Sequence, residues 1–166
     1  LIGLSLSAMR RRVVESTGAR VALGGASEGF LGLMPGIVEE LLLSLDRGQP
    51  VYVLGGFGGA AGAVADALLG GAPNALTLAH QLERTEGYAD TLAAYDSRRT
   101  EHSDWAAIDY PAILLRLSEI GPAGLAAANG LDEAENRLLL TTRSLDVAVH
   151  LAMTGLSQVH DRDGAG

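Results

Sequence analysis

The sequence predicts an α/β fold: a Rossmann-like parallel sheet with flanking helices and a helix-rich C-terminal half. Two short apolar runs, at residues 21–23 (VAL) and 51–54 (VYVL), each end in a glycine pair, and a helical pattern follows each of them. This strand, glycine-turn and helix pattern recurs within about 30 residues, the size of a βαβ unit. Both turns should therefore lie at the carboxyl edge of the sheet, where open α/β sheets bind their ligands.

Length and composition indicate one globular domain. The chain has 166 residues, of which 48% are hydrophobic, and we expect a core at 8–72 with a helical covering and tail at 73–166. The formal net charge is −8, and every one of the 12 basic residues is arginine. A broad basic face is therefore not expected, which argues against nucleic acid as a partner.

The sequence favours a cytoplasmic protein without a membrane partner. No apolar run approaches the roughly 20 residues that a spanning helix needs, and the lack of cysteine suits a reducing compartment. The first residue is not Met, which is consistent with a piece of a longer chain.

The N-terminal segment predicts an arginine-bearing helix. Residues 1–6 fit the end of a strand or a linker, and Ser7 is a plausible N-cap. The helix that follows would place Met9, Val13 and Val14 on one apolar face. Its arginines, Arg10 to Arg12, are by default a solvated face. Gly18 should end the helix.

The first strand, at 21–23, reads as a buried central strand. The connection at 26–34 (ASEGFLGLM) is long for a strand-to-helix loop, and such loops are usually functional or mobile. Pro35 suits a first helical turn. Glu39 and Glu40 are either ordinary first-turn acids on the solvent side or part of a ligand site, since this helix starts at the carboxyl edge of the sheet.

The second strand, at 51–54, is the clearest in the chain, and a helix should follow its glycines up to Gly70. No phosphate-loop motif with lysine and no complete dinucleotide fingerprint is present, so neither an ATPase nor a dehydrogenase is predicted. After Pro73, helices are expected around 75–83, 86–95 and 104–118, with two more opening at Asp132 and Ser144 and a frayed end at 161–166.

Other kinds of site find little support. The four histidines have no metal-ligand spacing, so neither a metal nor a cofactor is expected. Ser27 lacks the strand and helix context of a nucleophile elbow. Trp105 and Tyr110 are better suited to filling a junction between helices than to stacking a base.

Four segments together resemble a known family. They are MRRR (9–12), GARVALGG (18–25), MPGIVEELL (34–42) and QPVYVLGGFGG (49–59). Their order resembles the SLOG superfamily of Rossmann-like nucleotide-binding domains, with Lonely-Guy and DprA-type members and the nucleotide sensors of bacterial conflict systems. The tail NGLDEAENRLLLTTRSLDVAV is also similar to a divergent prokaryotic branch. The resemblance implies a homodimer or higher homo-oligomer, and a sequence that covers the later part of the domain, because further strands normally precede the arginine helix.

The resemblance also suggests roles for individual residues. Arg10 falls near the basic pair of the family's phosphoribohydrolases, and Glu39 falls at the glutamate of their Pro-Gly-Gly-x-Gly-Thr-x-x-Glu motif. Gly36 matches the glycine before the threonine, but the threonine position is Ile37, which has no hydroxyl. The loop at 26–34 also separates the glycine pair from Pro35. These two departures look more like a non-catalytic branch.

Three functions follow. In the first, the chain is a sensor or regulatory domain for a nucleotide or NAD-derived ligand, bound by Arg10, Arg11, Gly24, Gly25, Ser27, Met34, Pro35, Gly36, Ile37, Glu40, Gly55, Gly56, Phe57, Gly58 and Gly59. In the second, it is a phosphoribohydrolase that cleaves the N-glycosidic bond of a nucleoside monophosphate, with Glu39 and Arg10 as catalytic residues. The third is a structural or interaction domain.

Overall fold

The computed structural model describes residues 2–101 and 105–164. The elements, in chain order, are α1 (Ile2–Glu15), β1 (Arg20–Leu23), α2 (Gly36–Asp46), β2 (Val51–Leu54), the short 3-10 helix η1 (Gly55–Phe57), α3 (Gly59–Leu68), the 3-10 helix η2 (Asn74–Leu76), α4 (Leu78–Arg84), α5 (Tyr88–Arg99), α6 (Tyr110–Asn129), α7 (Glu133–Thr141) and α8 (Leu145–Gly164). The class is therefore α/β with a predominance of helix.

The sheet consists of two parallel strands in the described residues. β1 pairs with β2 from Arg20 opposite Val51 to Leu23 opposite Leu54. The parallel pairing confirms that both glycine turns lie at one edge of the sheet. The sequence predicted a Rossmann-like sheet, but residues 2–101 and 105–164 contain no larger sheet than this pair of strands.

The two strands differ in burial. β2 is buried on both faces, with Val51 and Val53 in one core cluster and Tyr52 in another. In β1, by contrast, Val21 and Leu23 are each 49% exposed. The prediction of a fully buried first strand is therefore wrong, because the helices that cover one face of β2 do not extend over β1.

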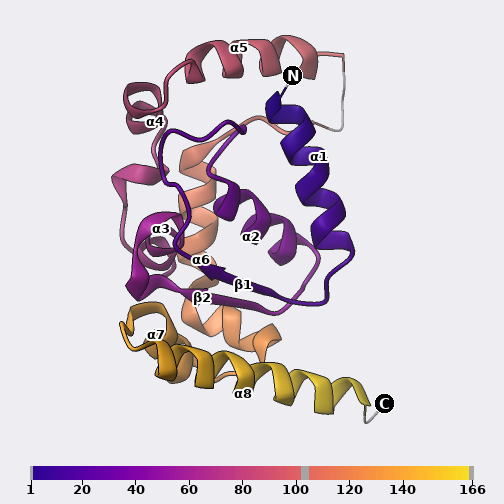
Figure 1. Ribbon diagram of the computed structural model, residues 1–166, viewed down its shortest axis with the longest axis vertical. Helices are drawn as coiled ribbons and strands as arrows, with labels where there is room; N and C mark the ends of the chain where they lie inside the picture. The colour runs from indigo at the N-terminus through magenta and orange to yellow at the C-terminus, as the bar shows by residue number, and fades with distance from the viewer. Residues whose placement is uncertain (1, 102–104, 165–166) are drawn as a thin grey trace.

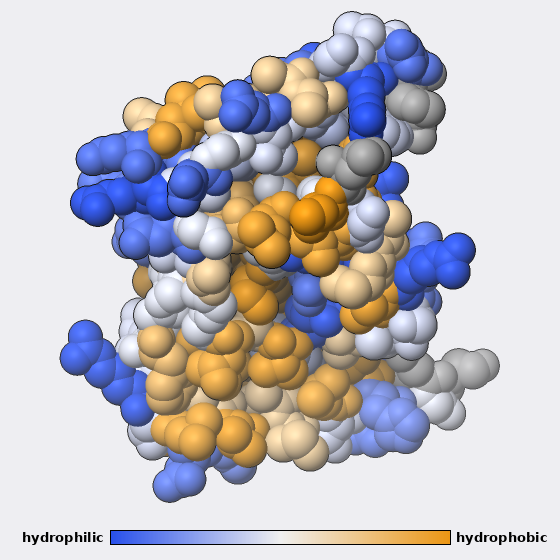
Figure 2. Space-filling view, turned by 45° about the horizontal axis from the view of Figure 1, so that its top comes forward, coloured by the Kyte–Doolittle hydropathy of each residue, from blue (hydrophilic) through white to orange (hydrophobic). Residues whose placement is uncertain are grey.

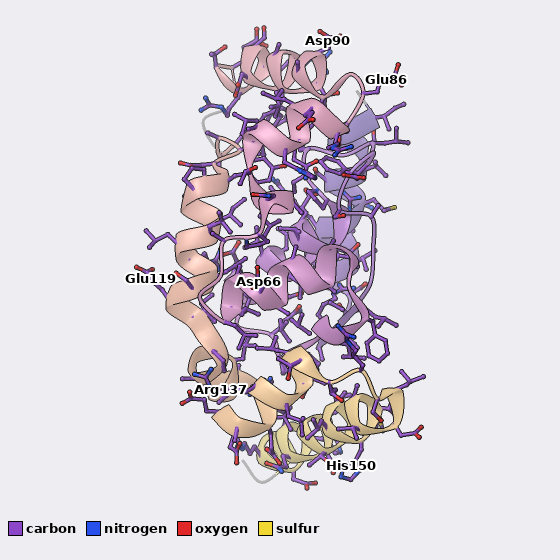
Figure 3. All side chains as sticks on the ribbon, turned by 90° about the vertical axis from the view of Figure 1, so that its left-hand side faces the viewer. Asp66, Glu86, Asp90, Glu119, Arg137 and His150 are labelled. Atoms are coloured by element: carbon purple, nitrogen blue, oxygen red, sulfur yellow. The ribbon has the colours of Figure 1, made fainter. Side chains whose placement is uncertain are left out.

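Helices surround the sheet in a consistent arrangement. Figure 1 shows α4 and α5 at one end of the molecule, α7 and α8 at the other, and the sheet with α1, α2 and α3 between them. Seen from the side, α6 runs along one flank between the two ends (Figure 3). In that view the labelled charges Glu119 and Arg137 point away from the core.

The N-terminal helix differs from its prediction in two respects. Residues 2–6 belong to α1, so Ser7 lies inside the helix and does not cap it. The buried positions of α1 are Gly3, Ser7 and Val14, whereas Met9 is 50% exposed. The arginine-bearing helix is confirmed and Val14 is buried, but an apolar face that also contains Met9 and Val13 is wrong, since Val13 is 38% exposed. The physical reason lies in Arg10, whose ion pair with α2 turns its side of the helix toward the protein.

The covering helices appear in the predicted order with shifted bounds. α6 begins at Tyr110, because Asp109 accepts a hydrogen bond from the Ala112 amide at 3.0 Å and caps the helix. It runs to Asn129 through a kink at Gly121, where φ is 53°. The predicted start at residue 104 lies outside the described residues.

The last two helices begin where the sequence predicted. Asp132 and Glu135 form a reciprocal capping box with two 2.8 Å hydrogen bonds. Ser144 accepts a hydrogen bond from the Val147 amide at 3.4 Å just before α8. α8 continues to Gly164, so a frayed end over residues 161–164 is wrong, and the rest of that prediction lies outside the described residues.

One face of the molecule carries exposed apolar side chains. In Figure 2 they gather in the lower half, where Figure 1 places β1 and α8. The exposed apolar residues of these two elements include Val21 and Leu23 of β1, and Leu145, Val149 and Met153, which follow one another at intervals of four residues along α8. No helix in the described part of the chain has both the length and the apolar character needed to cross a membrane.

Candidate functional site

An ion-pair network joins α1, the first residue of β1 and the first turns of α2. Arg10 Nη1 lies 2.6 Å from Glu39 Oε2, and the two side chains are only 11% and 12% exposed. Arg10 Nε lies 3.9 Å from Glu40, whose other oxygen is 3.1 Å from Arg20 Nη1. Both glutamates therefore point toward arginines, and the interpretation that they are solvent-facing first-turn acids is wrong.

Two glycines, Gly32 and Gly36, lie directly against the Arg10 guanidinium. A Cβ atom on Gly36 would lie 2.5 Å from Arg10 Nη2, and one on Gly32 would lie 2.8 Å from Nη1. Each glycine thus allows the guanidinium to lie against the backbone. Nη2 has no hydrogen-bond acceptor among the residues that the structure describes. Arg10 is consequently held by Glu39 through one terminal nitrogen and presents the other toward the start of α2.

The first glycine turn packs against the same helix start. Gly25 has φ of +84°, and a Cβ there would overlap the side chain of Ile37. The Ile37 side chain therefore lies directly against Gly25. Arg10, Gly36, Ile37 and Gly25 come together in one cluster, which we call the α2 cradle.

The N-terminus of α2 has uncapped donors. Its N-cap is Pro35, which makes no side-chain capping bond, and the amides of Gly36 and Ile37 have no acceptor within the described ranges. Amide groups at such a position attract anions, because the helix dipole adds to their own partial charge. The α2 cradle thus combines two backbone donors with one guanidinium nitrogen.

The N-terminus of α3 is different. The amides of Ala60 and Ala61 donate to the carbonyl oxygens of Gly25 and Gly24 at 3.0 and 2.8 Å. The first glycine turn therefore occupies two of the amide donors that follow the second glycine turn. The close approach that glycine permits there is made by the protein's own backbone.

The backbone of residues 140–142 lies against the second glycine turn. A Cβ on Gly55 would collide with Ala65 and with the carbonyl oxygen of Leu140, and one on Gly56 would collide with Thr142. Phe57 is 37% exposed, and Gly58 and Gly59 are exposed beside it. Gly55 and Gly56 thus pack the turn against the end of α7, whereas residues 57–59 face solvent.

Other residues predicted for ligand binding lie around the cradle. Met34 is 8% exposed and belongs to the core, and Pro35 is buried next to it. Arg11 is exposed on α1 and lines a cavity that runs along the side of α2 from its first turn. Ser27 lies in the 26–34 loop, where its carbonyl accepts a hydrogen bond from Gln81.

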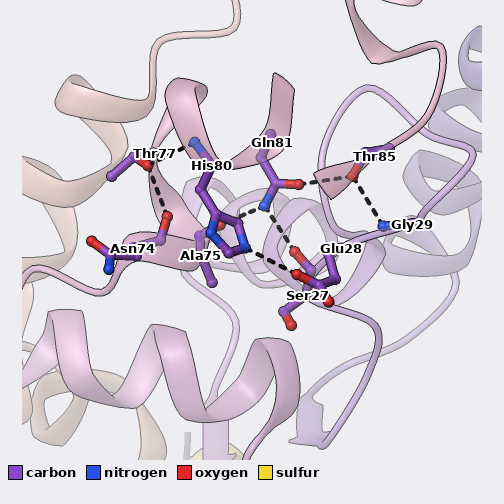
Figure 4. Close-up of polar contacts among 9 residues, drawn as sticks. All are labelled: Ser27, Glu28, Gly29, Asn74, Ala75, Thr77, His80, Gln81 and Thr85. Atoms are coloured by element: carbon purple, nitrogen blue, oxygen red, sulfur yellow. Dashed lines mark hydrogen bonds and ion pairs between the residues drawn. The ribbon is translucent and has the colours of Figure 1, made fainter. Parts of the chain in front are cut away.

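A buried glutamine attaches the 26–34 loop to α4 (Figure 4). Gln81 is fully buried, and its Nε2 donates to the carbonyls of Ser27 at 2.8 Å and Ala75 at 2.6 Å. Its Oε1 accepts from Thr85 Oγ1 at 3.0 Å, and that hydroxyl in turn accepts from the Gly29 amide at 2.9 Å. The loop that leads into the α2 cradle is therefore held by two of its backbone groups.

Further contacts fix the same loop. Glu28 Oε2 lies 3.2 Å from His80 Nε2 (Figure 4). Tyr88 donates to the Leu33 carbonyl at 2.6 Å, and its ring meets Phe30 edge-on at 5.4 Å between centroids. Burial raises the pKa of Tyr88, partly offset by its hydrogen bond to Tyr110. The hydroxyl that supports the loop therefore stays protonated beyond the ordinary tyrosine range.

Sequence reasoning missed several of these residues. Gly32 was seen only as one more glycine of a long loop. Gln81 and Thr85 carried a weak signal, since they are polar residues within a short amphipathic helix pattern. Arg20 stands directly before an apolar strand, a position where an arginine requires a partner, and that signal could have pointed to Glu40.

No group of three or more His, Asp or Glu side chains able to hold a metal ion occurs among the described residues. His102 lies outside them. Trp105 stacks on Tyr95 with ring centroids 5.5 Å apart, and Tyr110 is 1% exposed between helices. Both aromatic residues thus fill helix junctions, as the sequence predicted.

Comparison with known proteins identifies the family. The model of a family described as SLOG cluster2 matches residues 1–139, which extend from the start of α1 into α7. No curated protein and no solved structure matches the chain. The matched region contains the α2 cradle, both glycine turns and the 26–34 loop. The chain therefore belongs to the SLOG superfamily, in the family described as SLOG cluster2.

Proposed function

We propose that this chain binds a nucleotide or NAD-derived ligand at the α2 cradle and acts as a sensor or regulatory domain. The observation that carries the proposal is that three donors at or beside the start of α2 have no acceptor in the described residues: the Gly36 and Ile37 amides and Arg10 Nη2, which lies against Gly36. Three donors at one helix start suit a phosphate group of the ligand.

The environment of the cradle supports a phosphate. Arg10 is mostly buried and paired with Glu39, so its position is fixed before any ligand arrives. A preorganised guanidinium loses little conformational entropy on binding. The glycines Gly24 and Gly25 keep the adjoining backbone free of side chains, which would allow a ribose or a second phosphate to come close.

Ile37 favours binding over turnover. Its side chain lies over Gly25, where the resemblance places a threonine hydroxyl in the hydrolases. Glu39, the residue with the hydrolase glutamate's position, has one oxygen bound to Arg10. Because of both features, fewer polar groups are available for a hydrolytic reaction.

Isothermal titration calorimetry with ADP-ribose, cyclic ADP-ribose, NAD and AMP tests the proposal. At least one ligand should bind saturably, with an affinity that falls as salt rises. Arg10→Lys keeps the charge but removes the planar donor set, so binding should weaken by about tenfold or more. Arg137→Lys is the matched control, because Arg137 pairs with Glu133 on the exposed surface of α7.

The absence of saturable binding for all four ligands would contradict the proposal. Equal affinities for the Arg10→Lys and Arg137→Lys variants would do the same for the site. Circular dichroism of both variants shows whether each is folded, so that a lost fold is not taken for a lost site.

A second function, N-glycosidic cleavage of a nucleoside monophosphate, has one specific observation in its favour. Arg10 and Glu39 lie 29 positions apart in sequence yet meet at 2.6 Å, which brings a guanidinium and the second oxygen of a carboxylate to one place. Incubation with AMP should then release adenine, and Glu39→Gln should abolish the release. If binding is saturable and no base appears, the sensor role stands and the hydrolase role fails.

A further inference from the structure

A cavity of about 710 Å³ lies between α1, α2 and the start of α6. Its size is within the range of about 300–1,000 Å³ that is typical of small-molecule sites. Along α2 its wall is formed by residues 39, 42, 43 and 46, which share one helix face. It therefore extends along the side of α2, whereas the α2 cradle is at the helix start.

The floor of this cavity is apolar. Leu42 and Leu43 of α2 face it together with Ile108 from the segment before α6. All three side chains are only partly buried, although their helix and segment lie against the core. Apolar surface left uncovered within a cavity of this size gains free energy when an apolar group replaces the water.

The acids on the cavity wall are mostly occupied by partners. Glu39 is bound to Arg10, Asp46 lies 2.7 Å from Arg116, and Asp109 accepts the capping hydrogen bond of α6. Among the described acids that line the cavity, only Glu15 has no ion-pair or hydrogen-bond partner.

The arginines on the rim are not neutralised in the same way. Arg11 and Arg12 line the cavity from α1, both are exposed, and neither makes an ion pair within the described ranges. Ser7, on the same helix, is 5% exposed, and its hydroxyl has no hydrogen-bond partner. The α1 side of the rim therefore presents two guanidinium groups without a counter-ion in the described residues, beside an apolar floor.

We infer that this cavity is a second binding site, which takes a small monoanionic acid with an apolar body. The body lies on Leu42, Leu43 and Ile108, and the acid group meets Arg11 and Arg12. A polyphosphate fits less well, because Glu15 and the apolar floor disfavour further charge and strongly hydrated groups. The inference does not depend on the α2 cradle.

Octanoate and octan-1-ol are matched probes for this site, since they share a chain and differ in the acid group. Calorimetric titration should give an octanoate affinity at least about tenfold higher than that of octan-1-ol, because charge-assisted hydrogen bonds contribute only to the acid. The double variant Arg11→Ala/Arg12→Ala should make the two affinities equal. Both arginines are exposed, so the fold should persist.

A second variant closes the cavity. Ala8 lines it from the exposed side of α1, so Ala8→Phe should weaken binding of both probes by about tenfold or more. Ala93→Phe is the matched control, because Ala93 is exposed on α5 outside the cavity. Amide chemical shifts in nitrogen-edited spectra should change in α1, α2 and residues 105–113 when octanoate is added.

Three outcomes would overturn the inference. Octanoate and octan-1-ol could bind with equal affinity to the unaltered protein, octanoate could show no saturation, or the shifts could concentrate on the exposed apolar face of α8. Excess AMP should leave octanoate binding unchanged, whatever the outcome for AMP itself. Failure at this cavity and failure at the α2 cradle are therefore distinguishable.

Discussion

The two strand, turn and helix units of this chain are similar in sequence and different in structure. After β2 the glycines enter η1 and then α3, and α7 closes over them. After β1 the chain makes the 26–34 excursion before α2 begins. The amides at the start of α3 are used by the first turn, while those at the start of α2 are not. The same motif thus produces a packing junction in one unit and a candidate ligand site in the other.

The largest expected effect is a difference in stability between the two turns when a glycine in each is replaced by alanine. Gly55→Ala would press a Cβ into Ala65 and the Leu140 carbonyl, so the free energy of unfolding should fall by about 3 kcal/mol. Gly24→Ala meets no atom within 4 Å, and its φ of +60° should cost only about 1 kcal/mol. Urea denaturation measures both. Equal losses would mean that the two turns are packed alike.

A buried amide pair should be the next most sensitive feature of the β2 unit. Asn129 Nδ2 donates to the Val51 carbonyl at 2.9 Å and to Asn136 Oδ1 at 2.8 Å. Asn136→Ala removes one of the two hydrogen bonds of each polar atom of the buried Asn129 side chain, which should cost about 2 kcal/mol. Urea denaturation again gives the value. Asn74→Ala, at an exposed position, serves as control, and a loss below that of the control would contradict the role of the pair.

Loss of Gln81 should affect the β1 unit more locally. Gln81→Leu removes the hydrogen bonds to Ser27 and Thr85, so global stability should fall by about 1 kcal/mol. The Gly29 amide, which donates to Thr85, should exchange with solvent at least about tenfold faster. Hydrogen exchange followed by mass spectrometry tests this. Unchanged exchange in the 26–34 loop would show that Gln81 does not secure it.

The smallest effect concerns alkaline pH and β2. Burial raises the pKa of Tyr52 from 10.0 to about 12, and its hydroxyl donates to the Asn129 carbonyl at 2.7 Å. The unfolded chain loses this proton first, so the stabilisation is complete below pH 10 and is lost as pH rises through about 12. Tyr52→Phe should flatten this part of the stability profile. A slope that persists unchanged would assign it to other tyrosines.

Local patterns predicted much of this fold. The order of helices, the β2 strand, the Asp132 capping box and the glycine turns follow from short-range chemistry that can be recognised in the sequence. The N-terminal helix could not be predicted in its true orientation, because Arg10 turns inward only when Glu39 and the glycines Gly32 and Gly36 are present in space. Such a partner 29 positions away leaves no periodic signal.

The candidate site was predicted in its components and not in its arrangement. The motif pointed to Arg10, Gly25, Gly36 and Ile37. Their clustering depends on the path of the 26–34 loop, which is held against α4 before it leads into α2. The exposure of β1 was also out of reach, since strand composition alone does not tell what covers each face.

β1 is an edge strand of the sheet, because β2 is its one strand partner in the described residues. A strand edge without a partner is a template for intermolecular pairing unless charges or prolines guard it. Arg20, the one charged residue in β1, already pairs with Glu40, and the strand continues as Val21, Ala22 and Leu23. In the described residues the edge of β1 thus carries no charge without a partner, and it lacks the charge repulsion that guards many edge strands.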